Sequence, residues 1–191
     1  MYKRLMSSSI VGEEVRAWKT GIIPENVLAY DPAPHKRYVI WYRKPEVVEM
    51  KYSGDKGKLS GFFPMPGMIY VLARDTTYLF AFKGSKRPTL LTRLYVPPIH
   101  NTIGREDGSI CWGTVRKKND QDYFHDEIAV WENLLWDSLF TMHNDYKMKS
   151  GKPLSTVLKS IQMKKLGKGK FPTAELIDTK LLLRDIIKQL I

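Results

Sequence analysis

The sequence TRLYVPPIHNTIGREDGSICWGTV, residues 92–115, is the irregular stretch that divides this chain into two unlike parts. Segments rich in β-branched and aromatic residues precede it, and segments with helical spacing follow it. It contains a Pro-Pro pair, three glycines and the only cysteine of the chain, Cys111. His100 and Asn101 lie eleven and ten residues before that cysteine. We therefore expect any chemistry of the protein to be centred here.

The composition indicates a folded domain with a substantial core. The chain has 191 residues, of which 43% are hydrophobic, and five are tryptophans. A single cysteine rules out an intrachain disulfide and favours a reducing compartment. The N-terminal residues lack the apolar region of a signal peptide, and no apolar run is long enough to span a membrane. We expect a cytoplasmic protein without a membrane partner.

The residue pattern predicts strands first and helices later. Strands are expected at residues 36–43, 46–52, 68–74 and 77–83, after an extended segment at 22–30, with a Pro/Gly break at 62–67. A short helix is expected at 13–18. Apolar residues at helical spacing predict a longer helix from Phe124 to Met142, capped by Asp122, and further helices at 154–163 and 177–191.

This order predicts an α+β fold, in which helices pack on one face of an antiparallel β-meander. The cysteine would lie in the irregular segment between the sheet and the C-terminal helices. We expect a core at residues 1–145 and a basic helical extension at residues 146–191, packed on the core or following it.

Positive charge is concentrated in the expected extension. The net charge is +11, and residues 146–191 carry eleven lysines and arginines against three acidic residues. Such a surface suits nucleic acid, acidic lipid or an acidic protein, or is simply a solubilising face.

Each residue of the candidate site has two interpretations. Cys111 is either a nucleophile, flanked by Gly108 and Gly113 that would let a bulky partner approach, or a buried structural cysteine. The side-chain amide of Asn101 either stabilises an oxyanion or holds a turn. His100 is either a base or a hydrogen-bonding anchor for the loop.

Other site types lack support in the sequence. His125 and His143 follow Cys111, but no local signature of a cysteine protease surrounds it. One cysteine and four scattered histidines show no metal-ligand spacing, and no phosphate-binding or dinucleotide glycine pattern is present. We expect neither a cofactor nor a metal.

The stretch Asp107-Gly-Ser-Ile-Cys111, after Tyr95-Val-Pro-Pro98 and an asparagine, resembles the active-site region of ubiquitin-conjugating enzymes. It is most similar to bacterial members of that superfamily, including protein B of the PRTRC system and relatives in antiviral ubiquitin-like conjugation operons. The matching elements are Arg87-Pro88, Thr92-Arg-Leu-Tyr95, Pro98-Ile-His-Asn101 and Gly108-Ser-Ile-Cys111-Trp-Gly113, and Phe140-Thr-Met-His143 on the following helix. The resemblance covers roughly residues 25–145.

The resemblance implies a UBC-like fold and a thioester enzyme. Cys111 would receive a ubiquitin-like modifier from a ThiF-like activating enzyme and pass it to an amine on a target protein or another acceptor, with Asn101 stabilising the oxyanion. With this function we expect no cofactor and no membrane partner, and a nucleic-acid partner is not favoured.

The chain departs from the family pattern near the cysteine. The usual His-Pro-Asn lacks its proline, and Asn101 lies ten rather than eight residues before Cys111. The extra residues either loop out at residues 104–107 or move Asn101 out of reach, so that His100 or His143 would support transfer instead. No long N-terminal helix is evident, so the activating enzyme would dock differently.

Two other functions remain open from the sequence. One is a catalytically silent adaptor that binds a ubiquitin-like protein, which a buried Cys111 would favour. The other is a basic nucleic-acid-binding domain that stacks bases on Trp112 or tyrosines beside the lysine-rich tail.

Overall fold

The computed structural model of the chain describes residues 22–33, 36–53, 59–73, 76–102, 107–112, 124–141 and 145–190. The expected helix at residues 13–18 and the expected helix cap Asp122 lie outside these ranges. So do His143, Gly113 and most of the loop at residues 104–107.

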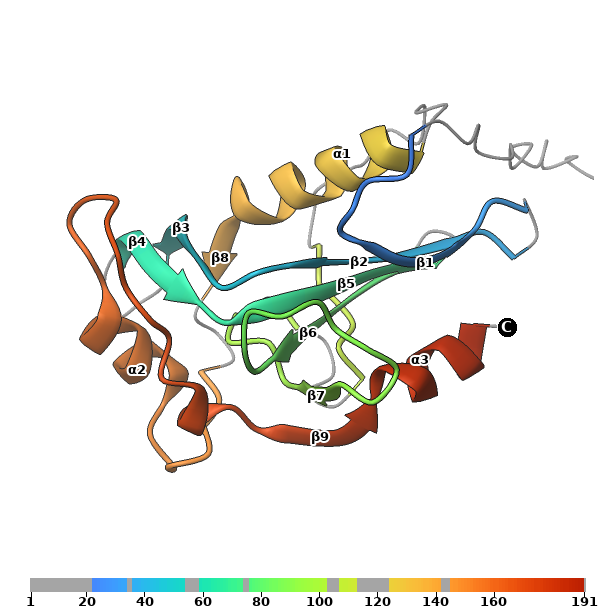
Figure 1. Cartoon of the computed structure of the whole chain (residues 1–191). Helices are drawn as coiled ribbons and strands as arrows, with labels where there is room; N and C mark the ends of the chain where they lie inside the picture. The colour runs from blue at the N-terminus through green and yellow to red at the C-terminus, as the bar shows by residue number, and fades with distance from the viewer. Residues whose placement is uncertain are drawn as a thin grey trace, which may run out of the picture.

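An antiparallel meander forms the body of the protein, as the sequence predicts (Figure 1). Its strands are β1 (Val27–Asp31), β2 (Tyr38–Arg43), β3 (Glu46–Ser53), β4 (Ser60–Met65), β5 (Gly67–Ala73) and β6 (Thr76–Phe82). Only Lys44 and Pro45 separate β2 from β3, and only Pro66 separates β4 from β5. The meander therefore bends at these prolines, with β2 pairing with β5 and β3 pairing with β4.

The bend produces two sheets. One has six strands in the order β1-β2-β5-β6-β7-β9, with β7 at Arg93–Tyr95 and β9 at Asp178–Leu182. The other has three strands in the order β4-β3-β8, with β8 at Leu139–Thr141. The Pro/Gly break expected at residues 62–67 is confined to Pro66, because β4 continues through Pro64 to Met65. An edge strand tolerates proline since its outer side needs no ladder donor.

Both faces of the large sheet are buried. Val39 and Trp41 of β2 belong to one hydrophobic cluster, whereas the alternate residues Tyr38, Ile40 and Tyr42 belong to another. Successive strand side chains point to opposite faces, so each cluster covers one face. The near-continuous apolar sequence of β2 follows from this double burial.

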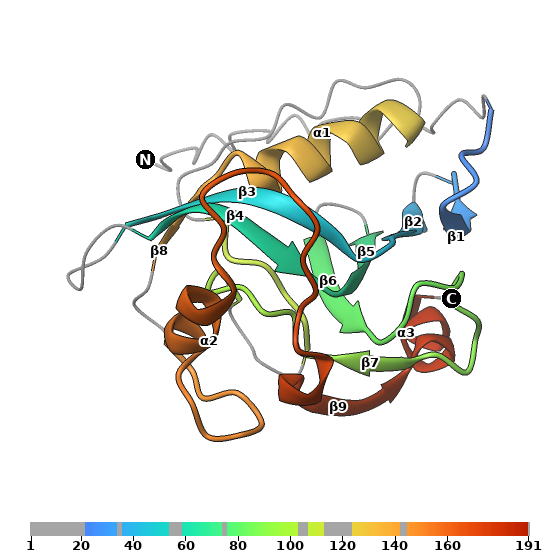
Figure 2. The ribbon, with the colours of Figure 1, turned by 60° about the vertical axis from the view of Figure 1, so that its left-hand side comes forward.

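Helices cover both of these faces (Figure 2). The first cluster includes residues of α1 (Phe124–Trp136) and α2 (Leu154–Ile161), whereas α3 (Leu183–Leu190) contributes Leu183 and Ile186 to the second. The α+β fold class is thus confirmed. The expectation that all helices pack on one face is wrong for α3, because β9 carries the chain along the sheet edge before that helix begins.

Helix α1 shows both the success and the limit of periodicity. Ile128, Trp131 and Leu135 are buried on one side, as their spacing predicts. The helix ends at Trp136, however, and Leu139 lies in β8, which runs parallel to β3 with Leu139 58% exposed. The Ser138 hydroxyl donates to the carbonyl oxygen of Leu134, and Phe140 then fills the core beside Tyr52.

The C-terminal segment begins as a strand rather than as the helix expected from residue 177. Thr179 of β9 donates its hydroxyl to the carbonyl oxygen of Leu94 at 2.8 Å, and Lys180 has a positive φ of 65°. Tyr146, Leu154 and further residues after position 145 lie in the same hydrophobic cluster as the sheet. The boundary between residues 145 and 146 stays a prediction about domain organisation.

Candidate active site

The segment that carries Cys111 is attached to the start of β6. The amide of Leu79 donates to the carbonyl oxygen of Gly108 at 2.8 Å, and the amide of Ile110 donates to that of Thr77 at 3.1 Å. These two bonds add residues 108–110 to the sheet as a short antiparallel partner. Cys111 follows directly and is exposed. The alternative of a buried structural cysteine is therefore excluded by the structure.

Gly108 is fixed by the sheet beneath it. Its φ is +74°, in the left-handed region that favours glycine. A Cβ at this position would lie 2.6 Å from Cζ of Phe80 and 2.8 Å from the carbonyl oxygen of Leu79. Gly108 is also buried, so it serves close packing of the turn on β6 rather than access for a partner. Asp107 closes the turn, because its Oδ1 accepts from the Ser109 amide at 2.9 Å and hydroxyl at 2.7 Å.

Asn101 lies opposite Cys111. The amide of Cys111 donates to the carbonyl oxygen of Asn101 at 2.8 Å, and Thr102 bridges Ile110 in antiparallel fashion. This register pairs residue 101 with residue 111, and paired side chains project from the same face with Cβ atoms about 4.5–5.5 Å apart. The longer spacing between Asn101 and Cys111 therefore leaves the two residues adjacent.

The side chain of Asn101 is oriented by β8. Its Oδ1 accepts a hydrogen bond from the amide of Thr141 at 3.4 Å, an interaction that the sequence did not suggest. No acceptor among the described residues takes a hydrogen bond from Nδ2. Because an amide nitrogen has two donor hydrogens, Nδ2 is suited to bind a negatively charged oxygen beside Cys111.

His100 is an internal anchor of the same loop. Its side chain has 0% exposure and packs edge-on against Tyr52, with ring centroids 5.2 Å apart. Nε2 lies 3.3 Å from Oδ1 of Asp145, which also accepts from the Ser155 amide at 2.8 Å; Oδ2 accepts from the Ser155 hydroxyl at 2.6 Å. Asp145 thereby joins the loop of Asn101 to the first turn of α2. This geometry favours the anchor over the base among the two interpretations of His100.

The pKa values of this pair fit an anchoring role. Burial lowers the pKa of His100 below its usual value, and the hydrogen bond and charge of Asp145 only partly oppose that shift. Burial raises the pKa of Asp145, but hydrogen bonds from Ser155 and His100 outweigh it and lower the pKa overall. A neutral imidazole therefore donates from Nε2 to an ionised carboxylate at neutral pH.

Trp112 holds the cysteine segment from the other side. Its ring packs against Trp131 of α1, with centroids 4.9 Å apart and an interplanar angle of 54°. Because its ring packs against Trp131, Trp112 is poorly placed to stack on nucleic-acid bases. The residue after the candidate nucleophile is thus fixed to α1.

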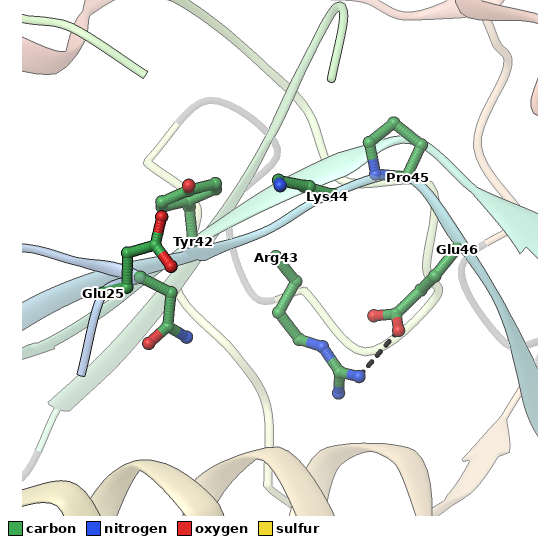
Figure 3. A pocket seen from close by; sticks show the side chains of 7 residues that line it. Glu25, Tyr42, Arg43, Lys44, Pro45 and Glu46 are labelled. Atoms are coloured by element: carbon green, nitrogen blue, oxygen red, sulfur yellow. Dashed lines mark hydrogen bonds and ion pairs between the residues drawn. The ribbon is translucent and has the colours of Figure 1, made fainter. Parts of the chain in front are cut away.

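A separate hollow lies where the meander bends (Figure 3). Its volume is about 380 Å³, and Arg43 and Glu46 point toward one another in it with a 2.6 Å ion pair. Arg43 also lies 3.3 Å from Glu132 of α1, which accepts from the Trp41 indole at 2.8 Å. Burial raises the pKa of both glutamates, with Arg43 opposing. This network ties α1 to the bend, and thereby supports the helix that holds Trp112.

Of the three residues singled out in the sequence, the structure pairs Cys111 with Asn101, whereas the side chain of His100 is buried against Tyr52 and Asp145. His125 of α1 instead faces Asp126 at 3.4 Å, and no hydrogen bond joins the Cys111 thiol to a histidine among the described residues. Within the same part of the chain, no three His, Cys, Asp or Glu residues are grouped to hold a metal. The sequence analysis missed Asp145, Thr141 and Trp131. The helical spacing of Trp131 indicated a core residue, and Thr141 lies inside the matching element Phe140-Thr-Met-His143, but neither signal indicated the contact that the structure shows.

One comparison with known proteins identifies a family. The model of one family, described as prokaryotic E2 family D, matches residues 1–179. No curated protein and no solved structure matches the chain. In the part of the chain that the structure describes, no helix is long and apolar enough to cross a membrane. Membership of an E2 family indicates a general role in conjugation of ubiquitin-like proteins, which involves such proteins and their activating enzymes. The chain belongs to prokaryotic E2 family D.

Proposed function

We propose that this protein carries a ubiquitin-like modifier as a thioester on Cys111 and transfers it to an amine. The observation that supports this most directly is the pairing of an exposed Cys111 with Asn101. In the proposal Cys111 is the nucleophile and Asn101 the amide donor, and the antiparallel pairing of the two residues supports these roles. A ThiF-like activating enzyme would supply the modifier. The gene for this protein would lie in a bacterial conjugation or defence operon.

Loading exchanges one thioester for another. The Cys111 thiolate attacks the carbonyl carbon of the modifier's C-terminal glycine, which is held as a thioester on the activating enzyme. The tetrahedral intermediate collapses by expelling the thiolate of that enzyme. One C–S bond forms and one breaks, so the step needs no oxidant and no metal. Its demands on this chain are exposure of the sulfur and a fixed backbone around it.

Transfer replaces the thioester with an amide. A neutral amine attacks the same carbonyl carbon, an oxyanion forms, and its collapse expels the Cys111 thiolate while the amine proton passes to water. Nδ2 of Asn101 would donate to the oxyanion. The bond from Thr141 to Oδ1 fixes the other end of the amide, so little reorganisation is needed. The buried His100 would act only by holding this loop.

The charging assay tests the proposal. The protein is mixed with ATP, a ThiF-like activating enzyme and its ubiquitin-like protein, and the products are separated on non-reducing gels with and without thiol. We expect a thiol-sensitive adduct that Cys111→Ala abolishes. Cys111→Ser should form an ester that resists thiol but is cleaved by base, which places the bond on residue 111.

The adaptor alternative gives a different result in the same assay. An adaptor would bind the ubiquitin-like protein without forming an adduct, and Cys111→Ala would bind it equally well. Absence of an adduct, with an activating enzyme shown to form its own thioester, would refute the proposed function.

A further inference from the structure

Eight lysines between residues 147 and 170 form what we call the lysine surface. All eight side chains are exposed, and no aspartate or glutamate occurs between Asp145 and Glu175. Its members are Lys147, Lys149, Lys152, Lys159, Lys164, Lys165, Lys168 and Lys170. The positive charge is therefore continuous along the sequence.

The lysine surface is part of the folded body. It covers the turn at residues 146–153, helix α2 and the loop at residues 162–172, which lie on the left-hand side of the molecule in Figure 1. The loop is fastened to β4: Met163 and Phe62 exchange backbone hydrogen bonds of 2.8 and 3.1 Å. Gln162 donates to the carbonyl oxygen of Ser60 at 2.8 Å. The charges are thus presented by a fixed scaffold.

In the described part of the chain, most of these charges lack a neutralising partner. Among the described residues, no lysine of the surface forms an ion pair. Of the two flanking carboxylates, Asp145 accepts from Ser155. Glu175 accepts from the Ser150 amide, and this hydrogen bond together with the charge of Lys152 lowers the pKa of Glu175, so Glu175 offsets part of the Lys152 charge only. Clustered like charges raise the local potential and attract anions. Binding of a polyanion would relieve this repulsion.

The side-chain types distinguish between classes of polyanion. Protein interfaces concentrate aromatic residues and arginine at their centres and are depleted in lysine. The lysine surface has no arginine, and its aromatic residues Tyr146 and Phe171 are buried. Proteins that bind single strands stack bases on exposed aromatic rings, which this surface also lacks. Lysine point charges without base-reading groups instead suit the phosphates of a duplex.

We propose that the lysine surface binds the phosphate backbone of double-stranded nucleic acid without sequence preference. This activity is separate from chemistry at Cys111. It would hold the protein on a duplex while its thioester site remains open to partners.

The test uses two variants that lower the net charge of +11 equally. One replaces Lys164, Lys165, Lys168 and Lys170 with glutamine. The matched control replaces Lys36, Lys44, Lys86 and Lys188, which are exposed and lie outside the lysine surface. Binding of a fluorescent random-sequence DNA duplex is followed by anisotropy over a range of salt concentrations, after thermal unfolding confirms that both variants are folded.

Each lost phosphate contact lowers the slope of log K against log salt by about 0.9. We expect the first variant to reduce the slope by about 3–4 if its four lysines contact phosphates, and the control by less than about one. Cys111→Ala should bind the duplex like the unaltered protein, because duplex binding does not depend on the thioester.

Three results would overturn the proposal. Equal losses in both variants would mean that only net charge matters. Binding to vesicles containing phosphatidylserine, without binding to the duplex, would identify a lipid surface as the partner. Failure to bind either probe at low salt would leave an acidic protein as the remaining partner.

Discussion

Replacement of Gly108 by alanine should destabilise the protein through two separable effects. The φ of +74° costs a residue with a Cβ about 1–2 kcal/mol. The new methyl group would also lie 2.6 Å from the Phe80 ring and 2.8 Å from a backbone oxygen, contacts that force a shift. Such overpacking typically costs about 1–3 kcal/mol. We therefore expect the free energy of unfolding to fall by about 2–5 kcal/mol in total.

Gly151 provides a matched control for the first effect. Its φ is +84°, but nothing lies within 4 Å of a Cβ built on it. Gly151→Ala should therefore lower the free energy of unfolding by about 1–2 kcal/mol. Urea unfolding, followed by tryptophan fluorescence, measures both variants. If the two lose equal stability, the Phe80 ring yields at no cost, and the inferred close packing of the turn on β6 is wrong.

Three further predictions concern the loop around Cys111. Asn101→Ala should form the thioester normally but slow its aminolysis by about 100- to 1,000-fold, measured in a single-turnover chase; equal loss in both steps would make Asn101 purely structural. Burial lowers the pKa of His100 in the folded protein below the 6.5 of the unfolded chain. As the pH falls below 6.5, the unfolded chain takes up the proton more readily than the folded protein, so the free energy of unfolding measured with urea should decrease. His100→Asn should flatten this dependence; an unchanged slope would exclude His100 as its source. Trp131→Ala should lower the free energy of unfolding by about 3–5 kcal/mol. It should also reduce charging of Cys111 in the folded variant, because Trp112 loses its packing partner. Normal charging would show that this contact does not position the site.

The elements that sequence predicted are those with strong local patterns. The strands of the meander are rich in β-branched and aromatic residues, and the buried side of α1 repeats at helical spacing. The C-terminal segment misled the prediction because its leucines also fit a helix, such as Leu181 and Leu182. This segment is a strand because β9 pairs with β7, in which Arg93 is the partner of Leu182, 89 positions away in the sequence. Propensity carries no information about such a distant partner.

The candidate site was predictable in its chemistry but not in its supports. Cys111, Asn101 and His100 were identified from residue type and order. Asp145 was not, because its function depends on His100 and Ser155, which reach it from two separate elements. The folded geometry distinguishes Asp145 from the other aspartates of the sequence.

The spacing of Asn101 and Cys111 shows why residue counts alone are a poor guide to a site. Ten residues instead of eight would separate the two side chains if the segment between them were extended. In an antiparallel hairpin the added residues enter the turn, while each hydrogen bond of the ladder fixes which residues face one another. Here the bond from Cys111 to Asn101 and the bridge between Thr102 and Ile110 fix that register. The interval between two such residues can therefore vary while their juxtaposition is kept, provided that the ladder beside them is intact.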